Sequence, residues 1–141
     1  MLHKYVMTAF VALLLGATAL GLGAAMDAPR SLMSRADRDR EVRVIERHTR
    51  VALGECRALE SSSREVCRAR SRAEDRIARA ELEARYLGTV AAAQNAGVVR
   101  AQARIDVARA QCRADDPGTV SECVAAARAD EARKAQLASA T

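Results

Sequence analysis

Apolar and small residues recur at every third or fourth position along most of the chain beyond residue 33, which is the period of one side of an α-helix. In the first two stretches these rows are Val42, Ile45, Thr49, Ala52, Cys56 and Leu59, and then Ile77, Ala80, Ala84 and Leu87. In the last two they are Ala91, Gln94, Val98, Ala101, Ile105, Ala108 and Cys112, and then Val120, Cys123, Ala127 and Leu137. The pattern predicts an all-α chain with four long helices, at residues 34–59, 63–87, 89–114 and 118–137.

Short polar breaks separate the predicted helices. A run of three serines ends the first, and Ser62 and Glu65 have the spacing of a capping box that starts the second. Gly88-Thr89 fits a helix stop followed by an N-cap, and Asp115-Asp116-Pro117-Gly118 separates the last two helices. Breaks this short place successive helices antiparallel, as in helical hairpins.

The chain contains an internal duplication at an offset of 56 residues. At this offset Cys56 aligns with Cys112, Cys67 with Cys123, and Val51-Ala52 with Val107-Ala108. We therefore expect two equivalent helical hairpins, at residues 34–87 and 88–138, followed by a tail at 139–141. Because the apolar rows contain few large side chains, the pattern leaves open whether the helices form a bundle or an extended coiled-coil-like array.

The cysteines indicate disulfide bonds. There are four, and ten residues lie inside each pair, which predicts Cys56–Cys67 and Cys112–Cys123 across the two hairpin turns. Each bond would contribute about 3 kcal/mol by the loop-entropy estimate. The same spacing would also suit Cys56–Cys123 and Cys67–Cys112 bonds between two continuous helices, as in twin-cysteine helix-hairpin proteins, although Pro117 and the serine run argue against continuous helices.

The N-terminus has the form of an export signal. A basic start is followed by an uncharged apolar run at residues 5–25, and Gly23 and Ala25 precede a cleavage point before Met26. We expect a signal peptide at 1–25, a flexible segment at 26–33, and a periplasmic or secreted mature protein. The alternative is an uncleaved inner-membrane anchor, because the run is long enough to span a bilayer. Only in that case would this segment contact a membrane.

The charge pattern is that of solvated helices. The net charge is +5, yet 23 basic and 18 acidic residues interleave closely, which favours ion pairs along helix faces. The densest basic stretch is a candidate contact for an anionic partner and contains Arg64, Arg68, Arg70, Arg72, Arg76 and Arg79. Tyr86 is the only aromatic residue beyond the N-terminal apolar run, which disfavours a nucleic-acid partner because single-strand binding uses aromatic platforms.

The sequence offers little for catalysis or metal binding. His48 is the only histidine after the leader, and its position among arginines favours a structural role. The cysteine spacing does not match the close ligand pairs of structural zinc sites. The acidic pairs Glu81/Glu83 and Glu74/Asp75 lie beside arginines and are expected to form ion pairs. We therefore expect no enzymatic activity, no cofactor and no metal.

The cysteine pairs, the stretch Ala-Glu-Leu-Glu-Ala-Arg-Tyr-Leu-Gly-Thr at 80–89 and the alanine-rich third helix together resemble a group of small exported helical proteins of Gram-negative bacteria. Members are generally uncharacterised and are sometimes labelled TolA-like cell envelope proteins. This chain differs in using Arg for Lys, and in its serine and Asp-Pro-Gly turns. The resemblance implies a location and a fold, but carries over no catalytic residue.

The expected function is a non-enzymatic structural or interaction protein of the periplasm that binds a protein partner or a second copy of itself. Two alternatives remain. One is an electrostatic binder of an anionic polymer such as lipopolysaccharide or nucleic acid, and the other is a thiol-based redox protein.

Overall fold

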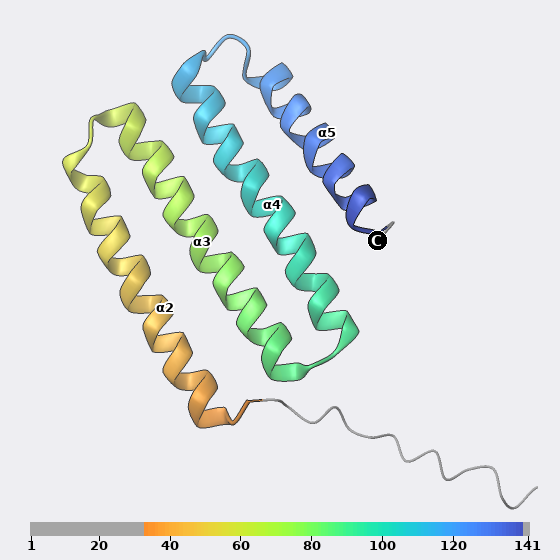
Figure 1. Cartoon of the computed structure of the whole chain (residues 1–141). Helices are drawn as coiled ribbons and strands as arrows, with labels where there is room; N and C mark the ends of the chain where they lie inside the picture. Colours follow the sequence, from red (N-terminus) through yellow and green to blue (C-terminus); the bar gives the residue numbers. More distant parts are fainter. Residues whose placement is uncertain (1–32, 140–141) are drawn as a thin grey trace, which may run out of the picture.

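The structure, a computed structural model, describes residues 33–139, so the predicted signal peptide and almost all of the segment 26–33 lie outside the described residues. Four helices and one short 3₁₀ turn follow one another along the chain (Figure 1). They are α2 (Arg35–Glu55), η1 (Cys56–Ala58), α3 (Ser61–Leu87), α4 (Val90–Asp115) and α5 (Val120–Ser139). The predicted helices are all present, with ends that differ by a few residues.

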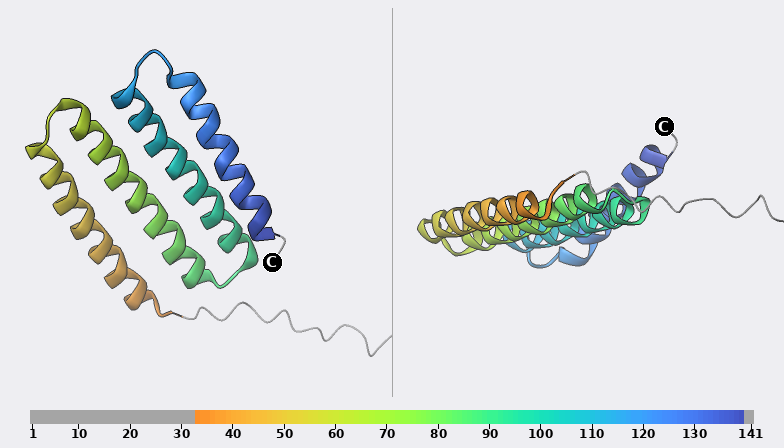
Figure 2. Two further views of the ribbon diagram at one scale, coloured as in Figure 1. Left: turned by 45° about the horizontal axis from the view of Figure 1, so that its top comes forward. Right: turned by 90° about the horizontal axis from the view of Figure 1, so that it is seen from below.

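The helices lie side by side, each antiparallel to the next, in a single layer. Figure 1 shows the layer face on, and the edge-on view in Figure 2 shows that α2, α3 and α4 form one sheet of helices from which α5 tilts. α2 packs on α3, α3 on α4 and α4 on α5, and no other pair of the described helices is in contact. Two disulfide-linked antiparallel hairpins are thus confirmed, and their arrangement is an extended array in which the middle pair, α3 and α4, has the largest contact.

Local capping fixes the start of α2, the end of α3 and the start of α4. Ser34 precedes α2, and its Oγ accepts a hydrogen bond from the Asp37 backbone N–H at 3.1 Å. α3 ends at Gly88, which adopts a left-handed φ of 62° that favours glycine. Thr89 then caps α4 by accepting from the Ala92 N–H at 3.2 Å, so the predicted stop and N-cap are confirmed.

The predicted capping box at Ser62 is wrong. α3 begins one residue earlier, at Ser61, after an extended Glu60 that makes no side-chain cap. The first backbone hydrogen bond of the helix runs from the Arg64 N–H to the Glu60 carbonyl at 2.7 Å, and the Arg64 guanidinium donates two more hydrogen bonds to the Leu59 carbonyl in the preceding turn.

The core is a thin strip of small side chains between neighbouring helices. Leu82, with 2% of its surface exposed, is the largest buried side chain among the described residues. In α4 the buried residues are Ala96, Ala103 and Ala110, at seven-residue spacing. They differ from the predicted α4 row, in which Val98 is 67% exposed. The reason is that α4 has a neighbour on each side, and the pattern identified only the row that faces α5.

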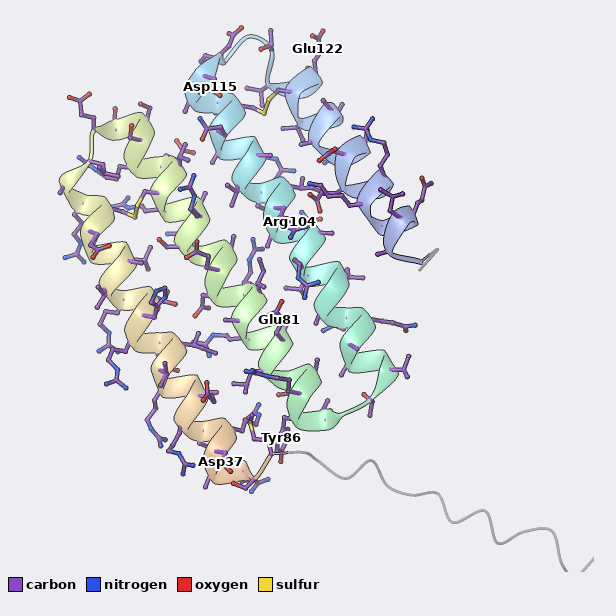
Figure 3. The ribbon with its side chains drawn as sticks, viewed as in Figure 1. Asp37, Glu81, Tyr86, Arg104, Asp115 and Glu122 are labelled. Atoms are coloured by element: carbon purple, nitrogen blue, oxygen red, sulfur yellow. A yellow bond between two sulfur atoms is a disulfide. The ribbon has the colours of Figure 1, made fainter. Side chains whose placement is uncertain are left out.

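Both disulfides of the hairpin interpretation are confirmed, and the alternative pairing is wrong. Cys56 is bonded to Cys67 and Cys112 to Cys123, with Cα–Cα distances of 5.6 and 5.9 Å. Figure 3 shows both bonds at the same end of the layer, each beside a hairpin turn. The two bonds therefore close α2 onto α3 and α4 onto α5 at equivalent places.

Candidate functional site

Arginine–carboxylate pairs join every neighbouring pair of helices. Between α2 and α3, the Arg38 guanidinium lies 2.9 Å from a Glu83 carboxylate oxygen and 5.2 Å above the Tyr86 ring. The remaining interhelical pairs are Arg79–Glu46, Arg76–Asp106, Arg100–Glu81, Arg113–Glu65 and Arg104–Glu131. Many of the closely interleaved charged residues of the sequence therefore form ion pairs that hold neighbouring helices together.

The basic stretch predicted to contact an anionic partner is divided by the fold. Arg64, Arg76 and Arg79 are engaged within the molecule, with the Leu59 carbonyl, Asp106 and Asp75 respectively. In contrast, Arg68, Arg70 and Arg72 are exposed and form no ion pair with the described residues. Since two residues turn an α-helix by about 200°, Arg70 projects from the opposite face of the layer to its two neighbours. The six arginines therefore do not form one site.

A smaller basic depression remains on one face of the layer. Arg64, Arg68 and Arg72 of α3 and Arg113 of α4 line it together with Glu65, in an open hollow of about 450 Å³. Arg113 is paired with Glu65 at 2.7 Å, which leaves Arg68 and Arg72 as its unpaired charges. Such a hollow can bind an anion electrostatically.

Two carboxylates at the helix contacts have perturbed acidity. Partial burial raises the pKa of Asp106, but hydrogen bonds from Arg76 and Gln102 and the charges of Arg76 and Arg109 outweigh burial and hold its pKa below the usual range. The pKa of Glu131 is also lowered, chiefly by its hydrogen bond from Lys134 and further by Arg104. For Asp106 the main partner, Arg76, lies across the contact of α3 with α4, whereas for Glu131 the main partner, Lys134, lies on the same helix and Arg104 of α4 adds to it. Both sets of ion pairs have a structural role.

The residues considered for catalysis are dispersed. His48 is exposed on α2, and of the acidic pairs Glu81, Glu83 and Asp75 each bind an arginine. Within residues 33–139 no three histidine, cysteine or acidic side chains gather in a way that could hold a metal ion. None of the helices in this range has the length and apolar character needed to cross a bilayer.

A second basic surface, which the sequence reasoning missed, lies on the side of α2 that faces away from α3. It consists of Arg40, Arg43, Val44, Arg47, Arg50 and Val51, and we call it the α2 outer edge. All six residues are exposed, and nitrogen-tipped side chains extend from this side of α2 in Figure 3. The signal was present in the sequence, because the arginines at 40, 43, 47 and 50 follow three- and four-residue helical spacing opposite the apolar row.

Comparisons of the chain with protein-family models, with curated proteins and with solved structures find no match.

Proposed function

We propose that the protein is a non-enzymatic structural or interaction protein of the cell envelope, exported to the periplasm, that acts by binding another macromolecule along its helices. The observation that carries this proposal is the single-layer arrangement of the helices. Among the described residues the two outer helices each contact one neighbour and no helix covers either broad face of the layer, so residues 33–139 present a large binding surface.

The disulfides support the proposed compartment. Cysteine pairs of this kind form and persist in oxidising environments such as the periplasm, and both hairpins contain one. The resemblance to small exported helical proteins supports the same location.

The proposal is tested in intact cells of a Gram-negative host that express the protein. The cells are treated with a membrane-permeable crosslinker and fractionated, and the isolated protein is analysed by mass spectrometry without reductant. We expect periplasmic protein that begins at Met26, contains two disulfides and appears in crosslinked complexes. An N-terminus at Met1 or four free thiols would contradict export, and a protein that is only ever monomeric in the cell would contradict the binding role.

One observation favours a second candidate function, the binding of an anionic polymer such as lipopolysaccharide. Arg68 and Arg72 are unpaired beside Arg64 and Arg113 in the basic depression. Binding of lipopolysaccharide that falls steeply with salt and is lost in Arg68→Glu/Arg72→Glu would support this function. No observation favours the redox alternative over a structural role for the cysteines, because all four are joined in the two disulfides and none is a free thiol.

A further inference from the structure

We infer that the α2 outer edge is a docking site for a helix of a partner protein that carries a row of carboxylates. The inference deepens the proposed function and rests on it, because it names the surface and the chemistry of the partner.

The internal duplication identifies this edge as a helix-binding surface. At the offset of 56 residues, α2 corresponds to α4, and α3 corresponds to α5. The counterparts of Arg40, Arg47 and Gly54 are then Ala96, Ala103 and Ala110, which are buried. This side of α4 is covered by α3, since Asp106 and Arg100 on it bind Arg76 and Glu81 of α3. In α2 the same side is exposed throughout, and none of the other described helices packs on it.

The residues at these equivalent positions differ in chemistry, and the difference specifies the partner. Arg50 stands at the position of Asp106, so a helix that takes the place of α3 would present a carboxylate where α3 has Arg76. Arg40 and Arg47 replace alanines, which adds two further cations along about 15 Å of helix. Arg43, Arg47 and Arg50 form no ion pair within the described residues, and Arg40 binds only Asp37. The edge therefore has an uncompensated positive charge that a row of acidic side chains would neutralise.

Exposed valines favour a helix over a flexible polyanion. Val44 and Val51 are 51% and 57% exposed, and they lie seven residues apart along one side of the arginine row. This is the spacing at which a second helix places apolar side chains in a coiled-coil contact, with charged pairs on the flanks. Nucleic acid or a polysaccharide would gain little from the valines, whereas an amphipathic helix would cover them.

A second copy of this chain fits the edge poorly. The acids Asp130 and Glu131 of α5 are already bound by Lys134, Arg133 and Arg104, so α5 presents no free row of carboxylates. Two α2 edges placed together would bring arginines against arginines.

The test uses the protein as isolated from cells and a synthetic amphipathic helical peptide with leucine at every seventh position and glutamate on the flanks. Binding is measured by calorimetry, and single-stranded DNA and heparin serve as flexible polyanions. We expect the peptide to bind, the variant Arg43→Glu/Arg47→Glu/Arg50→Glu to bind at least tenfold more weakly, and Val44→Ser/Val51→Ser to bind severalfold more weakly. The matched control is Arg70→Glu/Arg85→Glu/Arg128→Glu, which reverses three exposed arginines that lie outside both the α2 outer edge and the basic depression and form no ion pair among the described residues. This variant should bind the peptide as the parent does.

Three results would overturn the inference. In the first, the α2 variants bind the peptide as tightly as the parent does. In the second, the peptide does not bind, whereas heparin or DNA binds in a way that depends on the α2 arginines. In the third, the parent protein dimerises and the α2 variants do not. Far-ultraviolet circular dichroism of each variant separates loss of binding from loss of fold. Complexes in crosslinked cells that persist in the α2 variant would refute this docking site but leave the proposed function intact.

Discussion

At the scale of single residues, the close approach of α3 and α4 depends on small side chains. Ala96, Ala103 and Ala110 have 4%, 0% and 2% of their surface exposed, and each lies where a larger side chain would meet the facing helix. Because alanine adds little apolar area, the contact is stabilised by close packing of the two backbones and by the ion pairs on either side of it.

Enlarging the central alanine should therefore separate the helices. We expect Ala103→Leu to destabilise the protein by about 1–3 kcal/mol, since the new methyl groups have no space between α3 and α4. The matched control is Ala126→Leu, at an exposed position of α5, which should change stability by less than about 0.5 kcal/mol because the two residues have similar helix propensity. Urea unfolding at neutral pH measures both. Equal stability of the two variants would mean that α3 and α4 do not pack through this row.

At the scale of the helices, the features that could be predicted from the sequence are those set by residues close together along the chain. The spacing of Cys56 and Cys67 and the Gly88-Thr89 break determine the hairpin turns, and both are local features. The second buried row of α4 could not be read in the same way, because the alanines of both rows look alike and only the presence of α3 distinguishes them. Whether Arg72 is free or paired likewise depends on which carboxylates the neighbouring helix brings near it.

The contact between α3 and α4 should also make stability depend on pH. Asp106 has a lowered pKa in the folded protein, so its pair with Arg76 stabilises the fold above about pH 4 and is lost as the pH falls through the folded-state pKa. Asp106→Asn should lower the free energy of unfolding by less than about 1 kcal/mol at pH 7, because the ion pair is partly exposed. Below about pH 4 the free energy of unfolding of this variant should fall less steeply with pH than that of the parent.

Urea unfolding between about pH 7 and pH 2 checks this expectation. Glu41→Gln, which removes an exposed carboxylate without an ion-pair partner among the described residues, is the matched control and should keep the parent's pH dependence. The role assigned to Asp106 is wrong if the two variants have the same pH profile.

At the scale of the whole molecule, the single layer makes stability local. Within residues 33–139 each helix packs only on the helices next to it in sequence, as in repeat proteins whose units contact only the next unit. Of the two outer helices among the described residues, α5 is held less than α2, because a single ion pair joins it to its neighbour and Leu137 near its end is 71% exposed. The Cys112–Cys123 bond is therefore a principal restraint on this helix, which has one ion pair to α4 among the described residues, Arg104–Glu131. Cys56–Cys67 restrains α2, which is also held to α3 by two ion pairs, Arg38–Glu83 and Arg79–Glu46.

Removal of the two disulfides should consequently have different and separable effects. In Cys112→Ser/Cys123→Ser we expect hydrogen exchange to become fast in residues 120–139 while α3 keeps its protection. The variant loses about 3 kcal/mol of loop-closure stabilisation, and the contact of α5 with α4 is too small to keep the helix docked without it. In Cys56→Ser/Cys67→Ser the loss of protection should fall on α2 and leave α5 as in the parent. Hydrogen exchange with mass spectrometry at neutral pH resolves the helices. If either variant instead loses protection equally in all four helices, the layer unfolds as one cooperative unit. In that case α2, which carries the outer edge, opens as rarely as α3 and α4 do.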